Sequence, residues 1–222
     1  MQKLNEDLAE LVGAFIGDGC LSQYYIKNRK KWQQVILFTG SWRNDSLYYK
    51  NVIQPIIEKY FKVKCQFYHR KDDDTVRFRT YDKKIILFLL NLGFNFGPKA
   101  DNVIIPSIIF NDKKLMRGCV RGVFNTDGTI YQRYSKQYKN HPKYYKDYKV
   151  IQFKSKSHKL IKQIRLILSE FDLNPNKIIA DGKSNIHAVC RITSQPEVKR
   201  FEKEINTTHS YHIERMLNIC RK

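Results

Sequence analysis

The chain has 222 residues, of which 42% are hydrophobic, and its 41 Lys and Arg against 21 Asp and Glu give a formal net charge of +20. This length suits one large domain or two small ones, and no apolar run reaches the roughly 18 residues of a membrane span. Because the positive charge is spread along the chain among 14 tyrosines, we expect a nucleic-acid partner and no membrane. The N-terminus lacks the features of a secretory signal. The five cysteines have no C-x-x-C spacing, so neither a zinc site nor a disulfide framework is indicated, and an intracellular, reducing compartment is expected.

Hydrophobic periodicity predicts three helices and two hairpins in the first half of the chain. In order, the predicted elements are a helix at 6–18, strands at 21–27 and 32–39, a helix at 44–61, strands at 62–70 and 75–81, and a helix at 83–92. The run 35–38 is apolar on both faces, so alternation leaves open which of its side chains face the core.

The second half repeats this order after a linker rich in Gly and Pro. Its predicted elements are a helix at 114–127, strands at 130–135 and 148–153 joined by a long connection, a helix at 157–171, strands at 177–180 and 187–193, and a helix at 196–205. The segment 209–212 is interpreted as an ordinary polar loop. We therefore expect an α+β fold of two pseudo-symmetric αββαββα halves, each with a four-stranded antiparallel sheet. Residues 1–95 form the first half, 96–112 the linker and 113–222 the second half.

The first helix of each half carries a small residue at every fourth position. A glycine inside a helix is unfavourable by about 1 kcal/mol relative to alanine, so these positions need a reason, and close approach of two helix backbones supplies one. The positions are Ala9, Gly13 and Gly17 in one helix, and Gly118, Gly122 and Thr126 in the other.

An aspartate ends each of these helices, and a glycine follows it. We expect Gly19 and Gly128 to adopt the left-handed conformation that often ends a helix. Asp18 and Asp127 then lie at the negative ends of two paired helix dipoles and repel each other. A divalent cation resolves both conflicts, and the carbonyl oxygens of Gly17 and Thr126 can join the carboxylates as hard ligands, which suits Mg²⁺.

Residues 11–19 and 120–128 share Gly, Phe, Asp and Gly in register, and they resemble the two motifs of single-chain LAGLIDADG homing endonucleases. The resemblance covers nearly the whole chain, although the second motif departs from the pattern at Arg121, Asn125 and Thr126. It implies that the motif helices pack together and that the sheets form a saddle in successive major grooves of DNA. It also implies that the motif acids hold the metal between the scissile phosphates.

On this resemblance the protein is expected to be a monomer that makes double-strand breaks in a long asymmetric target of double-stranded DNA. Mg²⁺ is the expected cofactor, Mn²⁺ an alternative, and Ca²⁺ an ion that binds without supporting cleavage. A free-standing protein encoded in an intron is expected, in the cytoplasm of an archaeon or in a mitochondrion or chloroplast.

The resemblance also indicates basic residues near the acids. A polar or basic residue at the end of each half's second strand corresponds to Lys156 and, in the first half, to Ser41. A linker residue that approaches the metal corresponds to Lys99, and its second-half counterpart falls in 206–209. Lys99 and Lys156 are therefore candidate catalytic residues that stabilise transition-state charge.

Alternation along the strands gives one face of each sheet to the DNA groove, where Arg suits guanine and Gln suits adenine. The residues predicted for that face are Ser22, Tyr24, Gln66, Tyr68, Arg70, Arg77, Arg79, Tyr131, Arg133, Gln152, Lys154, Lys177 and Arg191.

Two alternatives stay open beside the nuclease. One is a maturase of the same fold that assists RNA splicing, since RNA is a polyanion too. The other is a DNA-binding regulator without catalysis, which would have no need of Asp18 or Asp127.

Overall fold

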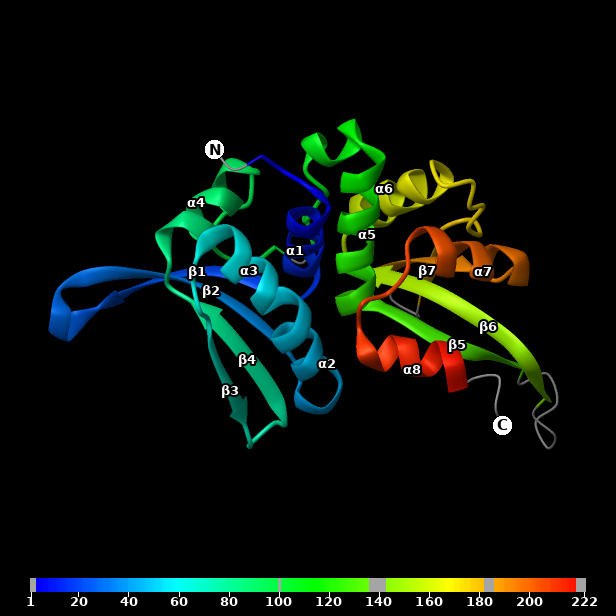
Figure 1. The fold of residues 1–222 in the computed structure, drawn as a ribbon, viewed down its shortest axis with the longest axis horizontal. Helices are drawn as coiled ribbons and strands as arrows, with labels where there is room; N and C mark the ends of the chain where they lie inside the picture. Colours follow the sequence, from blue (N-terminus) through cyan, green and yellow to red (C-terminus); the bar gives the residue numbers. More distant parts are fainter. Residues whose placement is uncertain (1–2, 100, 136–142, 182–185, 219–222) are drawn as a thin grey trace.

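The computed structural model describes residues 3–99, 101–135, 143–181 and 186–218. Two α+β halves lie side by side, with helices α1 (Glu6–Asp18) and α5 (Lys113–Asp127) next to each other between them (Figure 1). Each half contains one four-stranded antiparallel sheet with helices packed on one of its faces. The predicted α+β fold of two repeated halves is thus confirmed. None of the helices in the described ranges has the length and apolar character needed to cross a membrane.

The first half follows the predicted order, with one helix interrupted. After α1 its elements are β1 (Gly19–Ile26), a 3-10 turn (Lys27–Arg29), β2 (Lys31–Ser41), α2 (Trp42–Tyr48), a π-helical turn (Tyr49–Ile53), α3 (Gln54–Phe61), β3 (Gln66–Arg70), β4 (Thr75–Thr80) and α4 (Lys83–Asn91). The wide turn directly precedes Pro55 in the first turn of α3. A proline there lacks an N–H and its ring crowds the preceding turn, which accounts for the break in the regular helix.

The second half contains one helix more than the sequence indicated. After a 3-10 turn (Ser107–Asn111) and α5 come β5 (Gly128–Ser135), β6 (Lys143–Ser155), α6 (His158–Ser169), β7 (Ile179–Asp181), β8 (His187–Ile192), α7 (Gln195–Glu204) and α8 (Ser210–Asn218). The interpretation of 209–212 as a polar loop was wrong, because His209 and His212 are buried and α8 begins at Ser210. Strand β6 also starts before the predicted 148, whereas residues 136–142 of the predicted connection lie outside the described residues.

The strand registers make the two halves equivalent residue by residue. The sheet orders are β1-β2-β4-β3 and β5-β6-β8-β7. In the first sheet Gly19 pairs with Phe38, which pairs with Phe78. In the second sheet Gly128 pairs with Phe153, which pairs with Cys190. Each row starts at the glycine that follows a motif aspartate, so the halves can be superposed on their strands.

The same registers resolve the ambiguous run 35–38. Ile36 and Phe38 are buried in the core under the helices, together with Val76 and Phe78 of β4. Their neighbours, such as Leu37, therefore point to the opposite face of the sheet.

Helices α1 and α5 meet backbone to backbone along the predicted stripe of small residues. A Cβ added to Gly13 would overlap the Cys119 carbonyl oxygen and lie 2.8 Å from the Val123 nitrogen. One added to Gly122 would overlap the Glu10 carbonyl oxygen and lie 2.7 Å from the Ala14 nitrogen. The helix axes can approach this closely only because these positions carry no side chain.

The expectation of left-handed glycines after the motif helices was wrong. Gly19 has φ −78° and ψ 152°, and Gly128 has φ −81° and ψ 163°, so both are extended and start strands. Their glycine is needed for space instead. A Cβ would lie 2.7 Å from the Phe15 Cα at the first position, and at the second it would overlap Phe124 Cδ2 and lie 2.8 Å from Phe124 Cε2.

Candidate active site

The packing of the motif helices brings Asp18 and Asp127 together at one end of the helix pair. Each ends its helix, and Gly17 packs against Thr126, where an added Cβ would lie 2.7 Å from the Thr126 Cβ. The same added Cβ would lie 3.4 Å from the Asp127 carboxyl carbon. The two acids thus face the same small region, as their helix positions predicted.

The environment disfavours the charge on both carboxylates. The pKa of Asp18 is raised to about 8, mainly because burial removes water, with further repulsion from Asp127 and Asp45, while the Tyr49 hydrogen bond acts against the rise. Removal of water also raises the pKa of Asp127, which Lys99 opposes, although the Asp127 side chain still reaches solvent. A bound cation would relieve this conflict.

Tyr49 holds Asp18 directly. Its hydroxyl donates a hydrogen bond of 2.5 Å to Asp18 Oδ2, and its buried ring stacks on Phe78 with centroids 5.9 Å apart. Tyr49 opens the π-helical turn, a kind of irregularity that is frequent at functional sites. Within the described residues no hydrogen bond reaches the Asp127 carboxylate, so the two acids are held differently.

Lys99 reaches the end of α1 from the linker. Its ammonium donates to the carbonyl oxygens of Ile16 and Gly17, the second at 2.8 Å. These are unpaired carbonyls of a helix C-terminus, where a cation is favourable. Lys99 also lowers the pKa of both acids by its charge. It therefore shares the Gly17 carbonyl with any metal that uses this oxygen as a ligand.

The second basic candidate lies just beyond the end of β6, the second strand of its half. Lys156 is exposed just after β6, and no described contact joins it to either aspartate. Asp127 lines a gap too small for a water molecule, together with Lys154 and Ser155. The Thr126 hydroxyl bonds back to the Gly122 carbonyl at 3.0 Å.

The C-terminal segment makes a contact that the sequence did not indicate. His209 is fully buried, approaches Asp45 Oδ1 through Nε2 at 3.1 Å and stacks on Tyr48 at 5.0 Å. The other oxygen of Asp45 accepts the Ser41 backbone N–H at 2.6 Å. The region expected to supply a counterpart of Lys99 therefore supports the first half through Asp45.

The unusual polar residues of the second motif bind a buried acid of the first. Arg121 donates to Glu10 Oε2 at 2.8 Å, and Asn125 donates to Glu10 Oε1 at 3.2 Å. Thr208 also donates to Glu10, whose side chain is only 4% exposed. This network explains two of the departures from the motif pattern as a salt bridge and hydrogen bonds between the halves.

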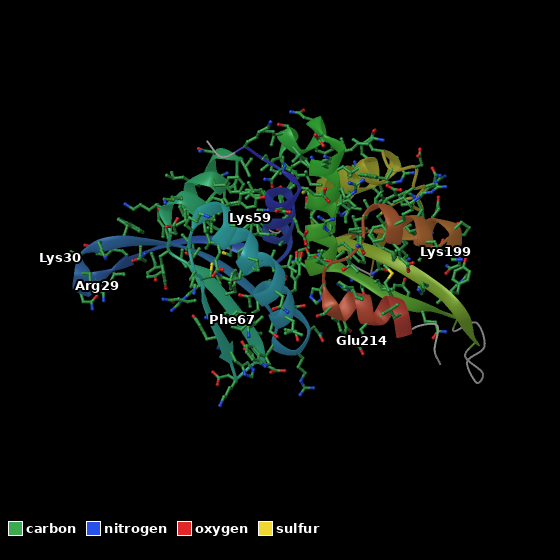
Figure 2. The ribbon with its side chains drawn as sticks, in the orientation of Figure 1. Arg29, Lys30, Lys59, Phe67, Lys199 and Glu214 are labelled. Carbon is green, nitrogen blue, oxygen red and sulfur yellow. The ribbon has the colours of Figure 1, made fainter. Side chains whose placement is uncertain are left out.

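Most of the residues predicted to face DNA lie on the sheet faces that the helices leave uncovered. In the first sheet Gln66 pairs with Arg79 and Tyr68 with Arg77, in register with Leu37 and Thr39 of β2. The other members placed on an uncovered face by strand alternation are Ser22, Tyr24, Arg70, Tyr131, Gln152, Lys154 and Arg191. Arg133 lies where the β5–β6 register shifts, and its guanidinium lies 5.0 Å from the centre of the Tyr148 ring. Lys177 precedes β7 and so does not lie on a strand. The tip of the long β1–β2 hairpin carries Arg29 and Lys30 far from the motif helices (Figure 2).

Comparison with known proteins agrees with this geometry. Residues 114–206 match the family described as the LAGLIDADG-like domain. The homing endonuclease I-DmoI in complex with DNA and Mn has a TM-score of 0.64 and 17% identity, covering 92% of this chain and 98% of its own. The I-LtrWI LAGLIDADG homing endonuclease bound to target DNA has a TM-score of 0.60 and 15% identity, covering 97% and 90%. Meganuclease I-SmaMI bound to uncleavable DNA has a TM-score of 0.61 and 13% identity, covering 99% and 89%. No curated protein sequence matches the chain.

These matches define the fold of the chain. Residues 114–206 match the LAGLIDADG-like domain, and the whole chain has the fold seen in the LAGLIDADG homing endonucleases. The resemblance that the two motifs carried is thereby confirmed.

Proposed function

We propose that this protein is a site-specific homing endonuclease that cuts both strands of a long asymmetric DNA target by divalent-metal-dependent hydrolysis. One observation carries the proposal: the two motif acids meet at the end of the helix pair. The uncovered faces of two pseudo-symmetric sheets flank these acids and carry Arg, Lys and Gln side chains. Solved structures of I-DmoI with DNA and Mn and with DNA and Ca support the choice of partner and of ion.

The donor set fits a hard divalent cation. Carboxylates of Asp18 and Asp127 would hold the ion, with the carbonyl oxygens of Gly17 and Thr126 as further ligands, and these are oxygen donors that Mg²⁺ or Mn²⁺ accepts. In the described part of the chain no group of three His, Cys, Asp or Glu side chains is arranged to enclose a metal. Two acids leave room for water and phosphate oxygens. When bound, the metal polarises the scissile phosphate and promotes attack by water.

The remaining residues have supporting roles in this proposal. Tyr49 fixes one oxygen of Asp18, and Lys99 places a positive charge beside both acids. Lys99 is thus suited to stabilising negative charge that develops on the phosphate. Lys156 would contact the DNA backbone from the end of β6.

The direct test is cleavage of a randomised double-stranded DNA library with Mg²⁺, followed by sequencing of the broken ends. We expect breaks at one long asymmetric sequence. Specific binding of DNA without breaks under Mg²⁺ or Mn²⁺ would contradict the enzyme and leave a regulator. Specific binding of a structured RNA in place of DNA would support a maturase.

Removing the Tyr49 hydroxyl is expected to weaken the metal site. Replacing Tyr49 by Phe should lower the affinity for Ca²⁺ by about 10- to 100-fold, the usual effect of losing a hydrogen bond that orients a metal ligand. Calorimetric titration with Ca²⁺ measures this without cleavage.

Tyr48→Phe provides the matched control. Tyr48 is the adjacent residue and equally buried, but its hydroxyl donates to Glu10 instead. Equal Ca²⁺ affinities of the two variants would show that Tyr49 has no role in orienting Asp18.

Metal affinity is also expected to depend on pH. In the metal-free protein the pKa of Asp18 is about 8, so below this pH a metal must displace the carboxyl proton. The apparent Ca²⁺ affinity should therefore fall by about tenfold for each pH unit below 8 and level off above it. Calorimetry in buffers of different ionisation enthalpy should detect the released proton. A constant affinity between about pH 6 and 9 would contradict a protonated Asp18, since a single titrating ligand must produce this slope.

A further inference from the structure

Two arginines occupy equivalent positions on the uncovered faces of the two sheets. Arg79 follows Phe78 in β4, and Arg191 follows Cys190 in β8. Phe78 and Cys190 are the third members of the paired rows that start at Gly19 and Gly128, the glycines after the motif aspartates. Each arginine is thus displaced from its own motif aspartate by the same number of strands and residues.

A glutamine side chain orients each arginine in the same way. Arg79 Nε donates to Gln66 Oε1 at 2.8 Å, and Arg191 Nε donates to Gln152 Oε1 at 2.7 Å. The glutamine comes from the outer strand β3 in the first half and from the inner strand β6 in the second. The same hydrogen bond is therefore built from different sequence positions.

Aromatic side chains add to this orientation. The Arg79 guanidinium lies 4.9 Å from the centre of the Tyr68 ring and 5.4 Å from that of Tyr81. In the second half the Tyr131 hydroxyl donates to the same Gln152 oxygen at 3.3 Å. Both guanidinium groups are thus held before any ligand binds, which reduces the entropy lost on binding.

This orientation leaves the two terminal nitrogens of each guanidinium available to donate hydrogen bonds to a ligand. The Nε–H of each arginine is engaged by Gln, and in the described residues no hydrogen bond or ion pair uses the terminal nitrogens of Arg79 or Arg191. Two parallel N–H donors match the O6 and N7 acceptors that guanine presents in the major groove. A phosphate group can accept the same two hydrogen bonds. However, a guanidinium fixed on the face of a sheet that enters the major groove contacts the edges of the bases.

We propose that Arg79 and Arg191 determine specificity by reading one guanine each, at two positions equidistant from the cleavage centre and on opposite DNA strands. The inference rests on the proposed function, because it needs the sheets to lie in the major groove. Equal distance follows from the matching registers, and opposite strands follow from the pseudo-twofold relation of the halves. The target is then symmetric at these two positions although it is asymmetric elsewhere.

The test is a binding selection, with Ca²⁺ in place of Mg²⁺, from randomised double-stranded DNA. The parent protein should enrich guanine at the two symmetric positions. Arg79→Lys should lose the preference at one position and Arg191→Lys at the other, each by about 5- to 100-fold, because lysine keeps the charge but lacks the bidentate fork. Gln66→Leu and Gln152→Leu should weaken the same preferences. Arg200→Lys is the matched control, since Arg200 is exposed on α7, in the layer of helices.

The outcomes separate this inference from the nuclease itself. Specific cleavage without paired guanines, or guanines that the lysine variants still select, would overturn the inference and keep the nuclease. Selection of both guanines by a protein that never cuts would keep the inference and overturn the nuclease. Recovery of no preferred DNA would overturn both. A thermal midpoint equal to the parent's shows that each variant is folded.

Discussion

Replacing Asp18 or Asp127 by Asn is expected to abolish double-strand cleavage while DNA binding persists. Each carboxylate supplies charge to the proposed metal, and a metal's stabilisation of transition-state charge is worth several kcal/mol. A loss of about 4 kcal/mol corresponds to a rate reduction of roughly a thousandfold. Single-turnover cleavage of the selected target, measured beside a gel-retardation assay, separates the two effects.

Thermal unfolding of the variants tests whether misfolding causes the loss of cleavage. The pKa of Asp18 is about 8 in the folded protein, whereas an unfolded Asp has a value of about 3.9. The folded state therefore binds more protons between these values, so this group lowers stability as pH rises from about 4 to 8. Asp18→Asn lacks this penalty and should unfold at a higher temperature than the parent at pH 8. Undiminished cleavage by both variants would rule out the acids as metal ligands.

Introducing one methyl group between the motif helices is expected to destabilise the protein strongly. In Gly122→Ala the new Cβ overlaps the Glu10 carbonyl oxygen and approaches the Ala14 nitrogen. Both obstacles are backbone atoms, so the helices must separate. Overpacking of this kind destabilises by about 3 kcal/mol, which for a chain of this size lowers the melting temperature by roughly 6–12 °C. Differential scanning calorimetry measures the shift.

A second glycine on the same interface gives the matched control. An added Cβ at Gly17 meets the side chain of Thr126 rather than backbone. Gly17→Ala should therefore also destabilise, but Thr126→Gly in the same chain should restore most of the loss. No trimming of a side chain should rescue Gly122→Ala. An unchanged melting temperature for Gly122→Ala would contradict the backbone contact between α1 and α5.

The features that the sequence predicts best are those with a strong local signal. Small residues at every fourth position indicated the pairing of α1 and α5, and the aspartates at the helix ends followed from that pairing. Strand alternation predicted the uncovered faces because hydrophobic and polar residues alternate clearly in β3 and β4. In contrast, the apolar run 35–38 needed its pairing partners before its orientation could be assigned.

The residues that sequence reasoning missed make contacts across long separations. Tyr49 lies 31 positions from Asp18, in a helix whose apolar periodicity indicates only packing. His209 lies 164 positions from Asp45, and it belongs to a polar segment that looks like a loop. Such residues become recognisable only when the fold brings their partners close.

The sequence singled out the two glycines after the motif helices, Gly19 and Gly128, but for the wrong physical reason. Glycine after a helix usually indicates a positive φ, and this rule predicted the left-handed conformation of Gly19 and Gly128. The space beside Phe15 and Phe124 requires glycine instead. From the sequence alone, a glycine required by a neighbouring aromatic ring cannot be distinguished from a glycine required by a positive φ.

The salt bridge between Glu10 and Arg121 joins the two halves through a buried charge. By the offset of 109 between the motif aspartates, the first-half positions that correspond to Arg121 and Asn125 are Val12 and Ile16. A homodimer of first halves would therefore bury two Glu10 carboxylates against apolar side chains, and losing the partner of a buried charge costs about 3–5 kcal/mol. Separation of the halves by a break in the linker should yield fragments that recombine with each other and not with themselves.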